Sequence, residues 1–509
     1  MGNNTFSATD GKGNLAVSAW AAVAGLTLLH VLLAYWTELI PEEAYYWTYS
    51  QHPALSYFDH PPMVAWIIWL GTALFGDNEF GVRSIAIALW PGSAWLLWQT
   101  GRLWFNAKTA DVAVLLFCLT PIFTAVGFIV TPDAPLLFFW LLTLYACSRA
   151  LHSGQGVYWL LAGFGLGCAM LSKYTAVMLA ASLLLFLLLS DRHRHWLRRV
   201  EPWLGLLLAL AVFSPVVIWN VQHHWASFLF QSSRTATVGH NPVHEASQFW
   251  LYQLLALTPL LLALHLYTLR PAIRRGWLQR EDAWNFAMSF ALPLFAVFVL
   301  ASFKNKGHVN WTAPTYLSWS LASAALAVEF QTAWQTHRPL LWRALAGCCA
   351  AVSLSAIALG HASLAFGMPA GLSMSNAGGW RAFAAEIGKA RAELGENAGR
   401  PTFVIGGDKL NISASVGFYL HDTANTVNDY AIGAPGIGYR YWTDLAQFAG
   451  RPAVVVLPRM EQYSIALLKV YFAQVGEPVW VEAQGQGRQR HGAYVIRCLG
   501  YAPRPEQQK

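Results

Sequence analysis

Charged residues are scarce in this chain. Of its 509 residues, 12% are charged and 56% are hydrophobic, whereas an ordinary soluble protein carries roughly 25% charged residues. The composition excludes an ordinary soluble protein and indicates many membrane spans. Cysteine is also scarce: there are six, five of them in apolar runs, which leaves no disulfide framework and no cysteine-based metal site. Neither G-x-G-x-x-G nor a Walker-type loop occurs, so the chemistry of soluble nucleotides has no support.

Long apolar stretches are abundant instead, and they recur up to about residue 361. Each is close to the roughly 20 residues that a membrane-spanning helix needs. We predict eleven such helices, at 15–37, 82–101, 109–129, 134–150, 157–172, 175–190, 203–220, 249–269, 284–302, 309–328 and 341–361. The stretch 62–75 is too short to span and is expected to be re-entrant or interfacial. The first run is too long for a signal-peptide core, so we expect it to remain as an anchor.

The basic residues predict the orientation in the membrane, because Lys and Arg in short loops are retained in the cytoplasm. With the N-terminus inside, the inner loops hold thirteen: Arg102, Lys108, Arg149, Arg192, Arg194, Arg198, Arg199, Arg270, Arg274, Arg275, Arg280, Arg338 and Arg343. The outer connections hold five: Arg83, Lys173, Arg234, Lys304 and Lys306. The formal charge of +7 is therefore a topological signal, and we expect no nucleic-acid partner.

Two regions follow from this pattern. Residues 1–361 form a transmembrane domain with outer loops at 38–81 and 221–248, and residues 362–509 form a C-terminal domain on the outer side. The C-terminal domain is expected to be small and α/β, with strands at 402–405, 453–457 and 493–496 and helices at 379–394 and 460–474. We assign it no chemistry.

The first outer loop holds the candidate catalytic acids. Glu42 and Glu43 follow Pro41, and because adjacent residues face different ways, at most one of them is expected to point into a site. Such a carboxylate is a candidate general base, a metal ligand or a hydrated helix cap. Asp59 and His60 precede two prolines that prevent a regular helix, so Asp59 could bind a cation and His60 a phosphate, or the segment is a structural turn.

Further polar residues stand at other outer helix junctions. Asp133 either caps the helix that it begins or joins a site. Three lysines are predicted on the outer face, where basic residues are otherwise few: Lys173, Lys304 and Lys306. We expect either that they bind a membrane-borne phosphate or that they snorkel to lipid headgroups. His223, beside tryptophans, completes a metal site with Asp59 or is a packing residue.

Taken together, these segments resemble the bacterial family 39 glycosyltransferases of the GT-C superfamily, a branch that includes protein O-mannosyltransferases and the lipid A aminoarabinose transferase. The matching stretches are Pro41–Trp47, Tyr57–Pro62, Thr131–Pro135, Leu171–Ala176, Ser214–Asn220 with the following His-Trp-Ala-Ser-Phe, and Asn310–Pro314. They occur in order over most of the chain up to about residue 330. Two positions depart from the family pattern: Glu42 stands where Asp is common, and Asp59-His60 stands where the aminoarabinose transferase has Glu-Lys.

The resemblance implies a GT-C fold and an enzyme of the bacterial inner membrane. Such an enzyme takes a sugar from a polyprenyl-phosphate carrier and passes it, with inversion, to a membrane or periplasmic acceptor such as lipid A, another glycolipid, a polysaccharide or a protein. Glu42, Glu43, Asp59 and Asp133 are then the catalytic acids. The carrier phosphate is expected to meet His60, Arg83, Lys173, Lys304 and Lys306, with a divalent cation as a further candidate.

Two alternatives from other classes remain open at this point. Many helices with buried charges also suit a transporter or flippase of a lipid-linked sugar, although transporters usually place polar groups near the middle of the membrane. A non-catalytic membrane assembly protein is the third reading.

Overall fold

The structure is a computed structural model that describes residues 10–236, 241–304, 307–367, 378–460, 465–487 and 489–504. By its internal contacts the chain divides into two compact units. Unit 1 comprises residues 1–31, 60–64 and 86–358, and unit 2 comprises residues 32–59, 65–85 and 359–509. The predicted boundary near residue 361 falls close to one of these limits. The first outer loop, however, groups with the C-terminal segment, whereas the sequence had placed it with the transmembrane domain.

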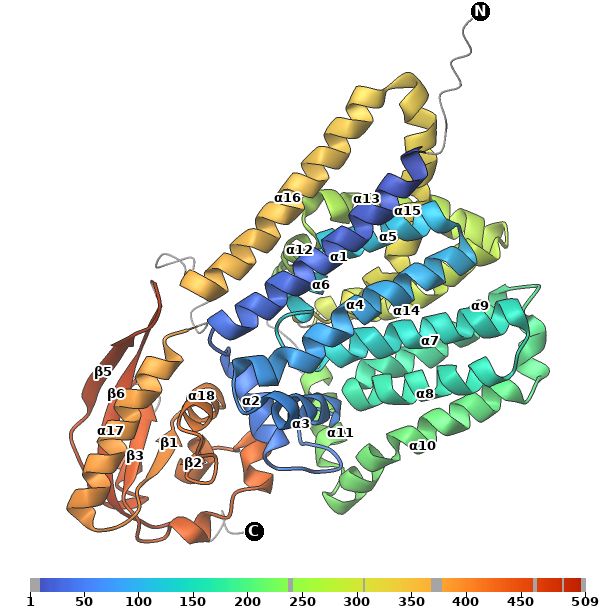
Figure 1. Ribbon diagram of the computed structural model, residues 1–509. Helices are drawn as coiled ribbons and strands as arrows, with labels where there is room; N and C mark the ends of the chain where they lie inside the picture. The colour runs from blue at the N-terminus through green and yellow to red at the C-terminus, as the bar shows by residue number, and fades with distance from the viewer. Residues whose placement is uncertain are drawn as a thin grey trace, which may run out of the picture. The chain divides into compact units, whose positions relative to one another are not determined.

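The apolar runs form helices, which Figure 1 shows in chain order. Their bounds are α1 (Asp10–Trp36), α2 (Pro41–Ser50), α3 (Met63–Phe75), α4 (Glu79–Trp104), α5 (Ala107–Leu119), α6 (Pro121–Val126), α7 (Asp133–Ser153), α8 (Val157–Ser172), α9 (Met178–Leu189), α10 (Glu201–Gln222), α11 (Ala226–Ala236), α12 (Pro242–Leu257), α13 (Pro259–Ile273), α14 (Asp282–Ser302), α15 (Ala313–His337) and α16 (Pro339–Phe366). Among the described residues, six helices are long and apolar enough to cross a membrane, or seven if α12 and the helical stretch 259–278 form one bent span. The chain is thus a multi-pass membrane protein.

Two predicted spans are broken in the structure. The run 109–129 is interrupted at Thr120, between α5 and α6, and the run 249–269 at Thr258, where the helix axis bends by 106°. A proline follows each break, and proline disfavours helical backbone in the residue before it. The shorter runs 62–75, 157–172 and 175–190 also form apolar helices, so the predicted segments are present while the count of eleven spans is not established.

Within unit 1, helices α7, α8 and α10 lie side by side (Figure 1), with α8 packed against both neighbours. The contact between α8 and α10 includes a close approach of the two backbones. A Cβ atom added to Gly163 would lie 2.0 Å from the carbonyl oxygen of Gly205, and one added to Gly205 would lie 2.3 Å from that of Trp159. Small residues let membrane helices approach this closely.

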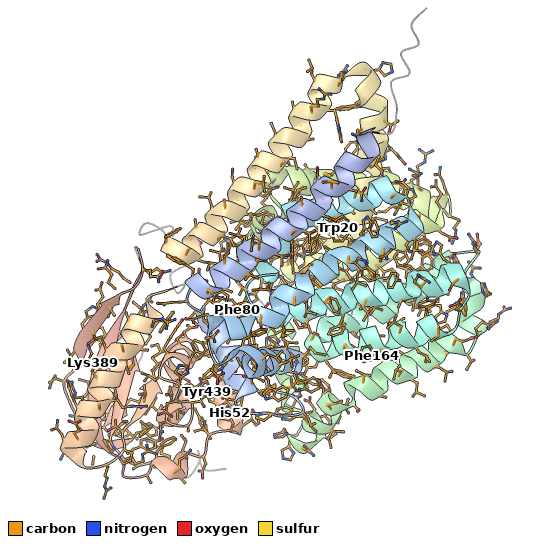
Figure 2. The ribbon with its side chains drawn as sticks, viewed as in Figure 1. Trp20, His52, Phe80, Phe164, Lys389 and Tyr439 are labelled. Atoms are coloured by element: carbon orange, nitrogen blue, oxygen red, sulfur yellow. The ribbon has the colours of Figure 1, made fainter. Side chains whose placement is uncertain are left out.

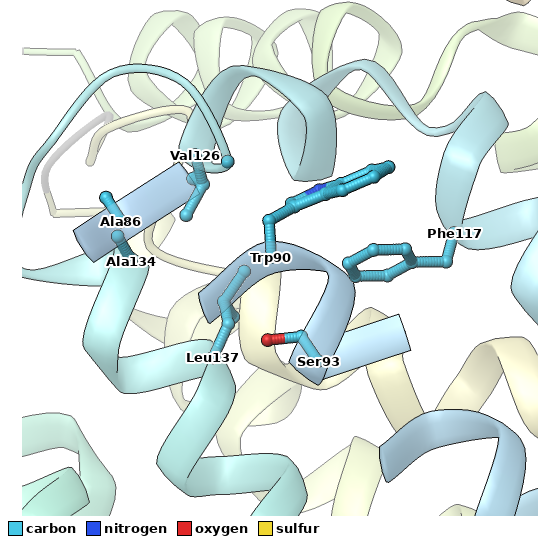
Figure 3. A pocket seen from close by; sticks show the side chains of 8 residues that line it. Ala86, Trp90, Ser93, Phe117, Val126, Ala134 and Leu137 are labelled. Carbon is cyan, nitrogen blue, oxygen red and sulfur yellow. The ribbon is translucent and has the colours of Figure 1, made fainter. Parts of the chain in front are cut away.

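A small cavity of about 10 Å³ lies beside Trp90, whose indole N–H donates to the carbonyl oxygen of Phe123 at 3.0 Å. Figure 3 shows the indole among side chains from α4, α5 and α7, with Ser93 and Phe117 nearby. The indole also occupies the space next to Gly127, where an added Cβ would lie 2.1 Å from the ring. This part of unit 1 is therefore packed around one tryptophan.

Unit 2 contains a six-stranded mixed sheet in the order β2-β1-β3-β6-β4, with β5 also paired to β6. The strands are β1 (Phe403–Gly406), β2 (Thr426–Val427), β3 (Ala453–Leu457), β4 (Phe472–Val475), β5 (Val479–Gln484) and β6 (Arg490–Tyr501). Strands β1, β2 and β3 are parallel to each other, and the others are antiparallel to their partners. Helix α17 (Trp380–Ala398) lies along the sheet (Figure 1) and contributes to an apolar core that includes Val404, Val454 and Val495.

The predicted α/β character of the C-terminal domain is confirmed. The predicted helix at 460–474 is wrong in its described part, because only Ile465–Leu468 (α19) is helical and β4 follows. The sequence also missed α18 (Asn411–Tyr419), which packs against α2 of the first outer loop. In that contact Trp47 meets Phe418 edge-to-face at 5.0 Å. This packing explains why the loop and the C-terminal segment form one unit.

Candidate functional site

Helix α2 carries the acidic pair, and its geometry separates the two carboxylates. Glu43 is 0% exposed, whereas Glu42 is exposed. Glu43 reaches back to accept the N–H of Ile40 at 3.1 Å, which satisfies a backbone donor at the start of the helix. As the sequence predicted, the two neighbours face different ways.

Glu43 forms a buried ion pair with Arg83. The Arg83 Nε donates to Glu43 Oε1 at 2.8 Å and Nη2 donates to Oε2 at 2.5 Å. Nη1 donates to the carbonyl and hydroxyl oxygens of Thr37, and Nη2 also donates to the carbonyl oxygen of Glu38. An arginine has five N–H donors, and these five bonds use all of them.

Arg83 therefore does not fit the predicted role of a carrier-phosphate ligand. It is 1% exposed and its donors are committed to Thr37, Glu38 and Glu43. Its position instead fixes the end of α1, the start of α2 and the start of α4 relative to each other. The sequence could not show this, because Glu43 and Arg83 are forty residues apart.

Glu42 keeps an exposed carboxylate on α2. Desolvation by the surrounding protein raises the pKa of Glu42, and the neighbouring Glu43 carboxylate raises it further. A carboxylate with a raised pKa takes up a proton more readily, which suits a general base.

Asp59 is held by phenols. Its Oδ1 accepts the hydroxyl of Tyr45 at 3.2 Å and that of Tyr49 in a shorter bond. Tyr45 in turn accepts the backbone N–H of Gly438, which belongs to the C-terminal segment, at 3.3 Å. Burial raises the pKa of Asp59, while the two phenols and the charge of Lys409 lower it.

The C-terminal segment thus contributes to the surroundings of Asp59, which the sequence did not predict. Tyr49 and Tyr57 stack with ring centroids 4.1 Å apart, and His52 stacks on Trp442 at 5.1 Å. Tyr439 stacks on Tyr45 at 6.2 Å; Figure 2 labels it together with His52. The aromatic residues of α2 and the Gly433–Gly438 region were the available signal, but their pairing is a tertiary contact.

In unit 1 a second carboxylate, that of Asp133, has partners from two distant segments of the chain. Lys173 Nζ lies 2.8 Å from Asp133 Oδ1 and 3.1 Å from Oδ2, and Asn310 Nδ2 lies 2.5 Å from Oδ2. Asp133 is 1% exposed and Lys173 is 12% exposed, so this is a buried, electrically neutral pair. Asp133 lies in the first turn of α7, as the capping prediction requires, but its carboxylate accepts from Lys173 and Asn310. The sequence had not singled out Asn310 as a site residue.

The remaining predicted residues lie as follows. Lys304 is exposed just after α14, His60 is partly buried just before α3, and Lys306 lies outside the described residues. His223 stacks on Trp219 with centroids 4.0 Å apart, and its Nδ1 lies 2.8 Å from the carbonyl oxygen of the same residue. This geometry matches the packing alternative for His223.

Within the described residues, no group of three or more His, Cys, Asp or Glu side chains is arranged to hold a metal ion. A divalent cation at Asp59 would therefore need oxygen ligands from water and from a bound phosphate. Mg²⁺ binds in this way, through one or two carboxylates together with substrate phosphates. The described residues therefore suit a cation that is held partly by a bound phosphate, and they do not form a site in which protein side chains supply all the ligands.

Comparison with known proteins supports the resemblance that the sequence indicated. The family described as dolichyl-phosphate-mannose-protein mannosyltransferase matches residues 59–219. A lipid A galacturonosyltransferase of Rhizobium johnstonii is 24% identical over 309 residues, which are 60% of this chain and 64% of that protein. An undecaprenyl phosphate-alpha-4-amino-4-deoxy-L-arabinose arabinosyl transferase of Pseudomonas savastanoi is 30% identical over 257 residues, 45% of this chain and 47% of that protein. The matches thus span about half to under two thirds of these relatives.

Solved structures confirm the fold. The structure of ArnT from Cupriavidus metallidurans bound to undecaprenyl phosphate has a TM-score of 0.64 at 14% identity, covering 96% of this chain and 98% of that one. An oligosaccharyltransferase of Archaeoglobus fulgidus has a TM-score of 0.51 at 13% identity, covering 96% and 74%. The chain therefore has the GT-C fold that was predicted, and the resemblance to the family 39 glycosyltransferases is confirmed.

Proposed function

We propose that this chain is an inverting glycosyltransferase that moves a sugar from a polyprenyl-phosphate carrier to an acceptor on the outer face of the inner membrane. The relatives named above are described as transferases of galacturonosyl and aminoarabinosyl groups. Lipid A or another cell-envelope glycolipid is accordingly the acceptor that we favour. The relatives give the transporter alternative no support.

The observation that carries this proposal is the meeting of three family segments at one carboxylate. Thr131–Pro135, Leu171–Ala176 and Asn310–Pro314 supported the resemblance on sequence alone, and each supplies one member of the Asp133, Lys173 and Asn310 cluster. Burying an ion pair costs free energy, so a buried pair is retained most readily where it has a role. We assign Asp133 the role of holding Lys173 at the helix junction.

We assign the reaction itself to the outer-loop residues. The bond between the anomeric carbon and the carrier-phosphate oxygen breaks, and the acceptor oxygen bonds to that carbon from the opposite side. Glu42 accepts the proton of an acceptor hydroxyl, or only orients the acceptor if this is a phosphate. Lys304, Lys306 and His60 are the cations proposed to stabilise the charge that develops on the departing phosphate.

Asp59 is proposed to orient bound groups through its phenol contacts, and it is the candidate ligand for a divalent cation. Such a cation would supply further positive charge to the carrier phosphate. Glu43 and Arg83 act as positioning residues, because their charges are matched to each other and buried.

The test is incubation of the purified protein with a panel of polyprenyl-phosphate sugars and membrane acceptors, with products identified by mass spectrometry. We expect one donor and acceptor pair to give a glycosylated acceptor and free polyprenyl phosphate. The Glu42→Gln variant should lose transfer while it still binds the carrier. The control Glu386→Gln, which removes an exposed carboxylate on α17, should keep full activity. Full transfer by Glu42→Gln would remove the role of Glu42, and no product with any donor would contradict the proposed function.

The proposed orientation has the N-terminus in the cytoplasm and the C-terminal domain in the periplasm. Lys389 is exposed on α17 (Figure 2), so a Lys389→Cys variant provides a labelling site. A membrane-impermeant thiol reagent should label this variant in intact spheroplasts. Labelling only after lysis would reverse the assignment.

A further inference from the structure

Unit 2 contains a recess that the proposed reaction does not use. It has a volume of about 450 Å³ and includes none of the proposed catalytic acids. Its lining comes from the end of α1, the start of α4, the start of α17 and the loop after β5, all within unit 2. The aromatic, charged and amide side chains of the lining include Trp36, Glu38, Glu79, Arg381, Gln484 and Gln486.

The lining carries two carboxylates and one guanidinium. Arg381 Nη2 is paired with Glu79 Oε1, and the Arg381 side chain is 63% exposed. Glu38 Oε2 accepts the backbone N–H of Trp380 at 2.7 Å and that of Arg381 at 3.4 Å. No described residue donates to Glu38 Oε1 or accepts from Nε and Nη1 of Arg381. One carboxylate oxygen and several guanidinium N–H groups are thus available to a ligand.

The net charge of the lining favours a ligand that bears a cation. The two carboxylates of Glu38 and Glu79 and the one guanidinium of Arg381 give the lining a formal net charge of −1. Burial raises the pKa of Glu38, while the N–H groups of Trp380 and Arg381 lower it. A desolvated carboxylate gains strongly from a charged hydrogen-bond donor. A headgroup with an anion and a primary ammonium would satisfy both Arg381 and Glu38.

The recess opens where a membrane-spanning helix ends. Tyr35 and Trp36 form the last turn of α1 and are 69% and 61% exposed. Tyr and Trp are enriched at the level of lipid headgroups, where an apolar ring and a polar edge are both accommodated. Gln484 and Gln486, which line the recess beside these rings, are exposed and add amide donors and acceptors.

We propose that this recess binds the headgroup of a membrane lipid in which a phosphate is followed by a primary ammonium group, as in phosphatidylethanolamine. The phosphate lies against Arg381 and the ammonium donates to Glu38. The acyl chains leave beside Trp36. The site is separate from the proposed reaction, and it gives the C-terminal domain a direct contact with the lipid bilayer.

The test is native mass spectrometry of the purified full chain titrated with three lipids that have the same acyl chains. Phosphatidylethanolamine offers phosphate and ammonium, phosphatidylcholine lacks the ammonium N–H groups, and phosphatidylglycerol lacks the cation. We expect phosphatidylethanolamine to bind about tenfold more tightly than the other two, the effect of one charged hydrogen bond. Glu38→Gln should reduce its affinity to that of phosphatidylcholine.

The matched control is Glu393→Gln, which removes a carboxylate from the same helix α17 where it pairs with Arg497. It should leave the lipid preference unchanged. If Glu38→Gln does not fold, crosslinking of wild-type protein by a photoreactive phosphatidylethanolamine should label the peptide that contains Trp36. Equal affinity for the three lipids, or crosslinking confined to other peptides, would overturn the proposal. Competition by soluble phosphoethanolamine at the same concentration as the lipid would show a site for a soluble molecule and would also overturn it.

Discussion

Removing Arg83 should destabilise unit 2 strongly. In Arg83→Met the Glu43 carboxylate, which is 0% exposed, loses two charged hydrogen bonds, and the oxygens of Thr37 and Glu38 lose three more. Removing one partner of a buried ion pair costs about 3–5 kcal/mol. Unit 2 has about 200 residues, and for that size 1 kcal/mol shifts the melting temperature by about 2–4 °C. The expected decrease is therefore about 6–20 °C.

A double-mutant cycle measures the pair directly. Glu43→Gln alone should cost about 3 kcal/mol, because it leaves the Arg83 charge buried. The double variant Glu43→Gln with Arg83→Met should cost clearly less than the sum, by about 2–4 kcal/mol, since neither charge is then left alone. The assay is thermal unfolding in detergent, followed by intrinsic fluorescence and by proteolysis of the C-terminal segment. Additive single effects would refute the ion pair as the link between α2 and α4.

Three further predictions follow from other parts of the chain. Gly127→Ala should cost about 1–3 kcal/mol, because its Cβ would meet the Trp90 ring, whereas Gly347→Ala, with open space around it, should be neutral or slightly stabilising; both are read from melting temperatures. Burial raises the pKa of Asp408 to about 6, from 3.8 in the unfolded chain, so its carboxyl should destabilise unit 2 increasingly as the pH rises from about 4 to 6. Asp408→Asn keeps one of the two oxygens that accept the N–H groups of Asn411 and Ile412 at the start of α18. Relative to the wild type, this variant should gain up to about 3 kcal/mol of stability between pH 4 and pH 8; an equal difference in stability at both values would count against this cause. Finally, EDTA should abolish transfer, with Mg²⁺ restoring it, if Asp59 holds a divalent cation; unchanged turnover in EDTA would exclude that requirement.

The helices were predictable because a bilayer demands long apolar runs, and these are visible in one sequence. The two broken spans were signalled by Pro121 and Pro259, but the run of hydrophobic residues outweighed that signal. In the C-terminal domain the strand at Ala453–Leu457 was found because it is fully buried and β-branched. Strand β5 was missed because most of its residues are exposed or partly buried and mix polar with apolar side chains.

The sequence identified many of the residues of the candidate site, but only in part which of them contact each other. Asp133 and Lys173 were both selected, yet their pairing depends on the packing of α7 against α8. Arg83 was given the wrong role, since its sequence neighbours do not reveal that Glu43 and the turn after α1 occupy its donors. Asn310 was quoted within a motif but not singled out, because an asparagine carries no charge to attract attention.

The backbone contact between α8 and α10 has a consequence for how the protein is made. Two helices that meet through Gly163 and Gly205 associate by close approach and need no polar side chain at the crossing. In lipid, where apolar side chains gain nothing by leaving their surroundings, such a seam is a principal source of affinity between neighbouring spans. This pair of helices, which α9 separates in the chain, can accordingly form during insertion, ahead of the later helices, and give them a rigid surface on which to assemble.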